Sequence, residues 1–191
     1  MVNVLVIAPY APPQNTAEAI QVRRILTELD TMAGGELVTI TPSASGWIVA
    51  DESLVLPLKH FKTQALKLPL HDLTERLFSS HHLSRFHVPD ALRWIIGMDR
   101  QILKSLTQKP DILYSRSYPI SAALLASKLH KKLNIPWVMH LSDPWVDSPY
   151  AKANQHSSAD EARCFAEASL ITVTTEQQAA FYQKKYPAHA T

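Results

Sequence analysis

Residues 140–145, His-Leu-Ser-Asp-Pro-Trp, bring an imidazole, a carboxylate and an indole close together along the chain. The carboxylate of Asp143 can accept hydrogen bonds from sugar hydroxyls, and the ring of Trp145 can cover the apolar face of a sugar. We therefore interpret Asp143 as a candidate catalytic residue, and Ser142 and Trp145 as candidate substrate-binding residues. The alternative for Asp143 is a structural role, because aspartate before proline often forms a turn.

His140 is the second candidate catalytic residue of this segment. An imidazole with an ordinary pKa near ~6.5 exchanges protons at neutral pH. The alternative is a histidine that is hydrogen-bonded within the core. If the segment before it is a strand, Val138 and His140 lie on one face, and Met139 and Leu141 lie on the other.

A second polar segment, residues 9–16, follows the apolar N-terminal run. It contains three prolines and no glycine, which excludes the glycine-rich dinucleotide fingerprint and the Walker loop. Gln14, Asn15 and Thr16 would reach a helix N-terminus, where free backbone N–H groups and the helix dipole favour anions. Asn15 could instead serve only to cap that helix, paired with Glu18.

A third polar segment is Ser-Arg-Ser-Tyr-Pro, residues 115–119. Arg116 can bind a carboxylate or a phosphate of a ligand, and Tyr118 lies beside it. Both are candidate substrate-binding residues. A solvated arginine, or one paired with another loop, is the alternative.

The sequence does not support a metal site or a catalytic thiol. His71, His81, His82 and His87 lack the helical i, i+4 spacing and the carboxylate ligand of a zinc site. Cys164 is the single cysteine; it lies in a helical pattern, so we interpret it as a packing residue. We expect no metal and no bound cofactor.

The segments that carry these residues alternate between strands and helices, which is typical of a parallel sheet with helical crossovers. Continuous aliphatic runs predict strands covered on both faces, and apolar residues at i, i+3, i+4 and i+7 predict helices. We expect strands at residues 2–8, 37–40, 54–58, 112–115, 136–141 and 170–173. We expect helices from about residue 16 to Gly34-Gly35, from Asp90 to residue 106, at residues 120–133 and 159–168, and from a capping box of Thr174 and Gln177 to residue 186, with two short helices within residues 59–87.

This order of elements predicts an α/β fold, a Rossmann-like three-layer α/β/α domain with a mainly parallel sheet. Ligands of such sheets bind outside the carboxyl ends of the strands. The three polar segments all follow strands, so we expect them to line one edge of the sheet.

The composition fits one compact domain of 191 residues, 46% of them hydrophobic. The formal net charge of +2 does not indicate nucleic-acid binding. Residues 59–109 carry nine Lys or Arg against four acidic residues, so they could meet an anionic acceptor or a membrane surface, or form a solvated basic face. Because the sequence has neither a signal peptide nor an apolar run of ~20 residues, we expect a cytoplasmic protein that could lie at the inner membrane face.

Several segments resemble the N-terminal domains of family 4 glycosyltransferases, which have the GT-B fold. They include the opening Val-Leu-Val-Ile-Ala-Pro-Tyr-Ala-Pro-Pro, and residues 19–26. More specific is the order of Val-Pro-Asp, Lys-Pro-Asp-Ile-Leu-Tyr-Ser and Ile-Pro-Trp-Val-Met-His-Leu-Ser-Asp-Pro-Trp between residues 88 and 145. Glu161, residues 166–168 and residues 171–176 are similar to the end of such a domain.

The resemblance implies two Rossmann-like domains across a cleft, with the acceptor mainly on the N-terminal domain and the nucleotide-sugar mainly on the C-terminal one. It implies transfer with retention of configuration and without a bound metal. It also implies that Asn15 and Thr16 lie near the donor phosphates and that Ser142 and Asp143 belong to the catalytic loop. On this resemblance, we expect residues 1–191 to form the N-terminal, acceptor-side domain, and the C-terminal donor-binding domain to be absent from this chain.

The sequence departs from the family at two places. Residues 13–16, Pro-Gln-Asn-Thr, stand where many relatives have two glycines. Ser142 stands where relatives have Arg or His before the aspartate.

The leading hypothesis is therefore half of a transferase that moves a sugar from a nucleotide-sugar to a saccharide or lipid-linked acceptor in cell-envelope or polysaccharide synthesis. The isolated domain is expected to be inactive. The alternatives are a non-catalytic Rossmann-like binding module and half of a GT-B-like sugar-nucleotide epimerase.

Overall fold

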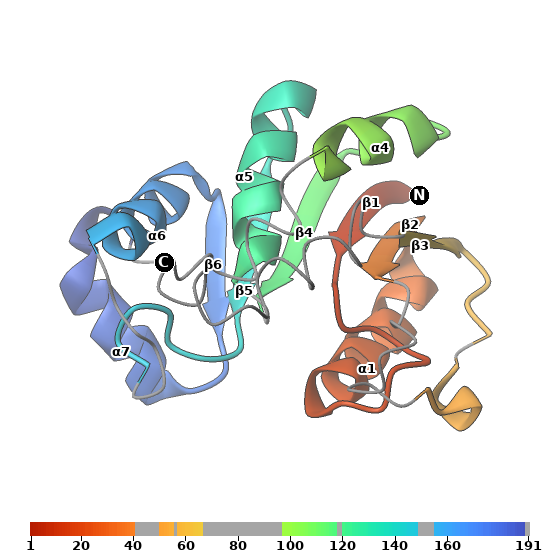
Figure 1. Cartoon of the computed structure of the whole chain (residues 1–191), viewed down its shortest axis with the longest axis horizontal. Coiled ribbons are helices and arrows are strands. Elements are labelled where there is room, and N and C mark those ends of the chain that lie inside the picture. Colours follow the sequence, from red (N-terminus) through yellow and green to blue (C-terminus); the bar gives the residue numbers. More distant parts are fainter. Residues whose placement is uncertain (41–49, 56, 67–96, 118–119, 149–154, 190–191) are drawn as a thin grey trace, which may run out of the picture.

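The computed structural model describes residues 1–40, 50–55, 57–66, 97–117, 120–148 and 155–189. Six strands form one sheet in the order β3-β2-β1-β4-β5-β6, and every neighbouring pair is parallel (Figure 1). The strands are β1 Val2–Ile7, β2 Ala33–Ile40, β3 Phe61–Leu66, β4 Ile112–Ser117, β5 Trp137–Leu141 and β6 Leu170–Val173. The α-helices are α1 Ala17–Met32, α4 Met98–Ser105, α5 Ser121–Leu133, α6 Gln155–Glu167 and α7 Glu176–Lys185, and η1 Glu52–Leu54 and η2 Pro187–His189 are 3-10 helices.

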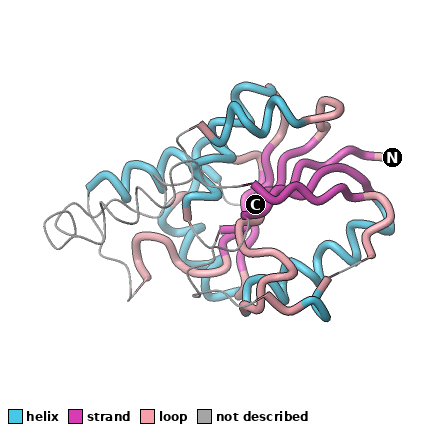
Figure 2. Tube along the Cα trace, turned by 45° about the vertical axis from the view of Figure 1, so that its right-hand side comes forward, coloured by secondary structure: helices cyan, strands magenta, loops and turns pink. Residues whose placement is uncertain are grey.

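The sheet is covered on both faces, which confirms the predicted three-layer α/β/α architecture. Side chains of β1 alternate between two core clusters. Leu5 and Ile7 pack into the cluster that contains residues of α4, α5, α6 and α7, whereas Val4 and Val6 pack with α1 on the opposite face. Figure 2 shows helices on both sides of the sheet. A continuous aliphatic strand is therefore needed at this central position.

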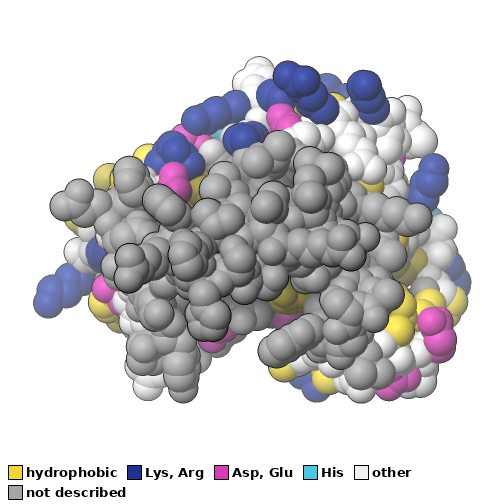
Figure 3. Space-filling view, in the orientation of Figure 1, with side chains coloured by type: hydrophobic (Ala, Val, Ile, Leu, Met, Phe, Trp, Pro, Cys, Tyr) yellow, Lys and Arg dark blue, Asp and Glu magenta, His cyan; other side chains and the backbone are white. Residues whose placement is uncertain are grey.

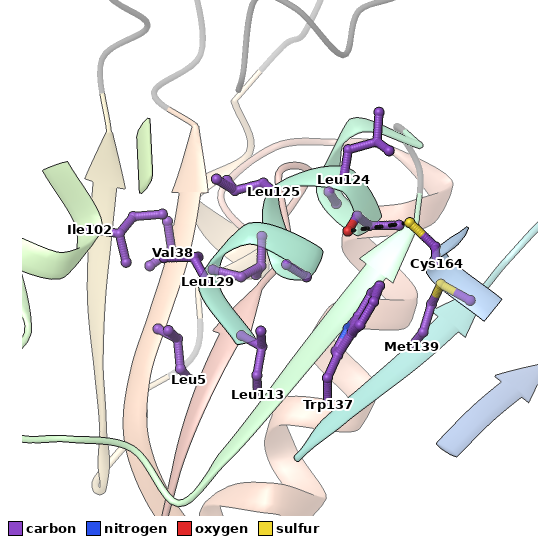
Figure 4. Packing of buried hydrophobic residues seen from close by; sticks show 14 of the residues in the cluster. Leu5, Val38, Ile102, Leu113, Leu124, Leu125, Leu129, Trp137, Met139 and Cys164 are labelled. Atoms are coloured by element: carbon purple, nitrogen blue, oxygen red, sulfur yellow. Dashed lines mark hydrogen bonds between the residues drawn. The ribbon is translucent and has the colours of Figure 1, made fainter. Parts of the chain in front are cut away.

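The larger core cluster lies between the sheet and α5. Figure 4 shows Leu125 and Leu129 of α5 gathered with Leu5 and Leu113 of the strands, and all four side chains are fully buried. The small residues of α5 let the helix lie close to the sheet, since every residue from Ser121 to Ser127 is buried. This core fixes the carboxyl ends of β1, β4 and β5 relative to one another.

The second strand is longer than expected, because the glycine pair belongs to β2 and does not end the helix. Helix α1 ends at Met32, and β2 begins at the next residue. Gly35 has a φ of +144°, and a Cβ atom there would lie 2.0 Å from the carbonyl oxygen of Val4. The close approach of β1 and β2 therefore requires a residue without a side chain.

The expected strand at residues 54–58 is wrong. Residues 52–54 form η1, in which Asp51 accepts a hydrogen bond from the backbone N–H of Ser53. The third strand is β3, parallel to β2 at the edge of the described sheet. Of residues 59–87, where two short helices were expected, residues 61–66 form this strand and residues 67–87 lie outside the described part. Only Phe61 and Leu66 are buried in β3, so its apolar pattern is too sparse to indicate a strand.

The remaining elements confirm the prediction with shifted ends. The helix expected from Asp90 is described only from Met98, and Gly97 before it has a left-handed φ of 81°; Asp90 lies outside the described residues. Helix α6 begins at residue 155 and not at 159. Thr175 and not Thr174 caps α7, by accepting a hydrogen bond from the backbone N–H of Gln178.

Candidate functional site

The candidate site lies where the strand order reverses. From the neighbouring strands β1 and β4 the sheet extends outward through β2 and β3 on one side and through β5 and β6 on the other. Loops after adjacent strands diverge at such a point and leave a crevice at the carboxyl edge, where ligands of these sheets bind. The end of β4 and the polar segments that follow β1 and β5 meet at this edge.

The segment after β1 is held by its own side chains. Gln14 is 1% exposed, and its Nε2 donates to the carbonyl oxygen of Pro9 at 3.0 Å. Thr16 caps α1, because its Oγ1 accepts a hydrogen bond from the backbone N–H of Ala19 at 3.0 Å. The predicted cap at Asn15 is therefore wrong, and Asn15 lies exposed before the helix.

Arg116 lies within β4, which is two residues longer than predicted, and it is 3% exposed. Its Nε donates to Glu18 Oε1 at 2.6 Å and its Nη2 donates to Glu18 Oε2 at 3.2 Å. Burial would lower the pKa of Arg116, but hydrogen bonding and attraction to Glu18 outweigh this effect and raise it. Of the two readings of Arg116, pairing within the protein is the one observed.

Ser142 joins this ion pair from the loop after β5. Its Oγ accepts a hydrogen bond from Arg116 Nη2 at 3.0 Å and donates to Glu18 Oε2 at 2.9 Å. Glu18, Arg116 and Ser142, the switch-point triad, thus connect α1, β4 and the loop after β5. Sequence reasoning assigned Glu18 only to a cap, and nothing along the chain links it to a residue 98 positions away.

His140 follows the predicted alternation, with Met139 and Leu141 buried on the other face of β5. Its Nδ1 lies 2.9 Å from the Oγ1 of Thr172, on the neighbouring strand. Burial, with the positive charge of Arg116 nearby, lowers the pKa of His140 to about 4. The imidazole is therefore neutral at neutral pH, and its ability to exchange protons there is weak.

Asp143 is the second residue of the loop after β5 and is exposed at the carboxyl edge. Within the described part of the chain, its carboxylate makes no hydrogen bond or ion pair. Trp145 differs, since it is 6% exposed and belongs to the larger core cluster. Its indole therefore packs the base of the loop and does not lie open to a sugar. Tyr118 lies outside the described residues.

The same loop is tied to the helices that flank β6. The backbone N–H of Trp145 donates to the hydroxyl of Tyr182 at 2.9 Å, and that of Val146 donates to Glu161 Oε2 at 2.8 Å. Lys185 of α7 donates to Asp147 at 2.5 Å and to Glu161 at 2.6 Å. Glu161 is fully buried, so its carboxylate is a fixed anchor. The sequence pattern did not reveal this role.

Metal and thiol chemistry have no support in the described residues. No group of three or more His, Cys, Asp or Glu side chains among them could hold a metal ion, and His71, His81, His82 and His87 lie outside them. Cys164 is fully buried, as the sequence predicted, and burial raises the pKa of its thiol to about 12. Burial therefore disfavours a thiolate nucleophile at this position.

Comparison with known proteins gives one family and several solved structures. The profile of the glycosyl transferase 4-like domain matches residues 16–190. The crystal structure of UGT89C1 from Arabidopsis thaliana complexed with UDP-L-rhamnose is 18% identical, with a TM-score of 0.59 over 98% of this chain and 50% of that protein. The same protein complexed with UDP gives a TM-score of 0.58 at 18% identity, over 99% of this chain and 47% of that protein.

A third structure is the UDP-GlcNAc 2-epimerase from Methanocaldococcus jannaschii, with a TM-score of 0.53 at 11% identity over 97% of this chain and 42% of that protein. The chain thus spans about half the length of the solved structures that it resembles. No curated protein matches the sequence. At these identities the structural likeness shows the fold, which is one Rossmann-like half of the GT-B architecture.

Proposed function

Because this chain belongs to the family of glycosyl transferase 4-like domains, we propose that it is the N-terminal, acceptor-side half of a GT-B glycosyltransferase. The enzyme transfers a sugar from a nucleotide-sugar to a saccharide or lipid-linked acceptor, with retention of configuration, in the synthesis of cell-envelope polysaccharides. A second domain supplies most of the donor site. The nucleotide-sugar is a substrate, and the reaction uses no cofactor or metal.

The observation that carries this proposal is the exposed carboxylate of Asp143 at the carboxyl edge, beside the switch-point triad. Arg116 and Glu18 hold Ser142, the residue before Asp143, through two hydrogen bonds. Tyr182 and Glu161 hold the loop two and three residues further on. Asp143 is thus an accessible acceptor on a fixed loop, which is the arrangement that positions a hydroxyl group for reaction.

The role that follows for Asp143 is to accept a hydrogen bond from the acceptor hydroxyl and to orient it toward the donor sugar. The oxygens of a carboxylate accept hydrogen bonds from hydroxyl groups, which suits this role. The donor is inferred to be a nucleotide-sugar, in keeping with the UDP and UDP-L-rhamnose complexes of the protein of like fold.

The test is a transfer assay with this chain joined to a donor-binding domain, comparing the Asp143→Asn variant with the unchanged protein. We expect kcat/KM to fall by about 100-fold or more, the size of effect that misplacement of a reacting group can cause. Glu28→Gln is the matched control, because Glu28 is an exposed acid on α1. Undiminished transfer by Asp143→Asn would disprove the site.

The same joined protein can distinguish a transferase from the two alternative functions, an epimerase half and a non-catalytic binding module. The epimerase of like fold motivates incubation with UDP-GlcNAc and no acceptor, where a transferase leaves the sugar configuration unchanged. Conversion to the epimer would favour an epimerase half. Binding of nucleotide-sugars without transfer or epimerisation would favour a non-catalytic module.

We further propose peripheral contact with an anionic membrane through exposed cations of α4 and α5. Figure 3 shows dark blue side chains gathered at the top of the view, where Figure 1 places α4 and the end of α5. None of the described helices is long and apolar enough to cross a membrane, so contact would be at the surface. This basic face consists of Arg100, Lys104, Lys128, Lys131 and Lys132.

A further inference from the structure

Three polar side chains form a row across neighbouring strands near the carboxyl edge. Arg116 of β4 is in register with His140 of β5, and His140 is in register with Thr172 of β6. All three point to the same face of the sheet, because Met139 and Leu141 occupy the other face of β5. His140 therefore lies between a guanidinium that is already paired and a hydroxyl.

The hydrogen bonds of this row leave one buried nitrogen without a partner. Arg116 is committed to Glu18 and Ser142, and His140 Nδ1 is committed to the Oγ1 of Thr172. His140 Nε2 is buried and has no hydrogen-bond partner among the residues that the structure describes. Buried polar atoms of folded proteins are nearly always paired, so an unpaired one needs a reason.

The bond to Thr172 determines which nitrogen of His140 carries the hydrogen. If the hydroxyl of Thr172 donates to Nδ1, Nε2 carries the ring hydrogen and only this hydrogen is unpaired. If Nδ1 donates instead, both the hydroxyl hydrogen of Thr172 and the lone pair of Nε2 are unpaired. The first arrangement satisfies more of the hydrogen-bonding capacity of the pair.

The charges that face the ring favour its neutral form. Arg116 on β4 opposes a second positive charge, and burial does the same. Glu18 on α1 would favour protonation, but its carboxylate is already bonded to Arg116 and Ser142. The ring therefore stays neutral.

We propose that Thr172 is a positioning residue that fixes His140 as the Nε2–H tautomer, so that the ring is held as a permanent uncharged donor beside the Arg116–Glu18 pair. His140 then does not exchange a proton during the reaction. That a reaction takes place at this edge rests on the proposed function, but the tautomer is a property of this chain alone.

The test is nitrogen NMR of the 191-residue chain with ¹⁵N-labelled histidine. We expect the spectrum of His140 to show a protonated Nε2 and a bare Nδ1, unchanged from about pH 5.5 to about pH 8, a range in which a free histidine titrates. Thr172→Val removes the hydroxyl at nearly constant shape and should give a mixture of tautomers. Thr172→Ser restores the hydroxyl and should restore the single tautomer.

Thr63→Val is the control, because Thr63 is an exposed threonine on the far edge strand β3; it should leave the His140 signals unchanged. A protonated Nδ1 in the unchanged chain, titration of His140 near neutral pH, or an unaltered tautomer in Thr172→Val would each overturn the proposal. The NMR test needs no substrate, so its outcome is independent of the transfer assay. The tautomer can be confirmed when the Asp143→Asn assay contradicts the proposed function, and it can be disproved when that assay supports it.

Discussion

Arg116 and Glu18 form an ion pair that is nearly removed from water, with 3% and 9% of the two side chains exposed. Taking two charges out of water costs several kcal/mol for each, and a buried pair repays this cost only when its geometry is good and its remaining hydrogen bonds are made. Two bonds between the partners and the bridge through Ser142 meet this condition. The pair therefore fixes where α1 begins relative to β4 more than it adds stability.

Removing one partner of this ion pair should lower the free energy of unfolding strongly, and removing both should lower it less. Arg116→Met leaves the carboxylate of Glu18 buried without its cation, so we expect the free energy of unfolding to fall by about 3–5 kcal/mol. Combined with Glu18→Leu, the loss should shrink, because no unpaired charge remains. Chemical denaturation of the two single variants and the double variant measures this coupling, and losses that simply add would contradict it.

At the scale of elements, α6 and α7 hold the loop after β5 through groups that differ in chemistry. Glu161 of α6 accepts hydrogen bonds from the backbone N–H of Val146, from Lys185 and from the hydroxyl of Tyr186 at 2.8 Å. The rings of Phe165, Tyr182 and Tyr186 pack against one another. The described part of the loop is therefore tied to the folded body, while Asp143 in its first turn is exposed.

We expect Glu161→Leu to release this loop, because it removes the acceptor for Val146 N–H and leaves Lys185 without its buried partner. Hydrogen exchange of the Val146 amide should accelerate strongly, while amides in β1 and β4 keep their protection. Glu161→Gln retains an acceptor oxygen and should have a smaller effect. Glu176→Gln, an exposed acid at the start of α7, serves as control, and equal acceleration in it would argue against a specific anchor.

At the scale of the whole molecule, the basic face and the candidate site lie at opposite ends of the sheet. Helix α5 begins after the carboxyl end of β4 and runs back, so its last cations precede the amino end of β5. Lys131 and Lys132 are paired with Glu167 and Asp99. Contact of this face with an anionic surface would therefore leave the carboxyl edge open to substrates.

Binding to vesicles tests this contact. A cation near an anionic membrane contributes about 1 kcal/mol, so replacing Arg100, Lys104 and Lys128 with glutamine should weaken binding to vesicles that contain phosphatidylglycerol by about 100-fold. Vesicles of phosphatidylcholine alone should bind neither protein. Co-sedimentation with vesicles measures the binding of the unchanged protein and of the triple variant.

The control removes the same charge from elsewhere on the surface. Arg24, Lys59 and Lys184 are exposed and lie on α1, before β3 and on α7. Their replacement by glutamine should leave most of the binding intact. Equal weakening by the two triple variants would mean that net charge, and not the basic face, attracts the membrane.

The sequence by itself determined the elements whose residues are unambiguous. The aliphatic run of β1 and the Ala- and Leu-rich pattern of α5 indicate buried elements, because few other structures bury so many consecutive apolar groups. The alternation along β5 likewise predicted the faces of Met139 and His140. The residue types of positions 140–145 directed attention to Asp143, and the family resemblance gave the GT-B assignment.

Only the tertiary structure decided the partners of the polar residues. Local sequence cannot show that Glu18 meets Arg116 and not the end of its own helix, because these residues come together only when α1 and β4 pack against the same sheet. The same reason applies to Glu161 and the loop after β5, and to the burial of Trp145. Hydrophobic periodicity reports which face of an element is buried, whereas a hydrogen-bond partner depends on which elements become neighbours in space.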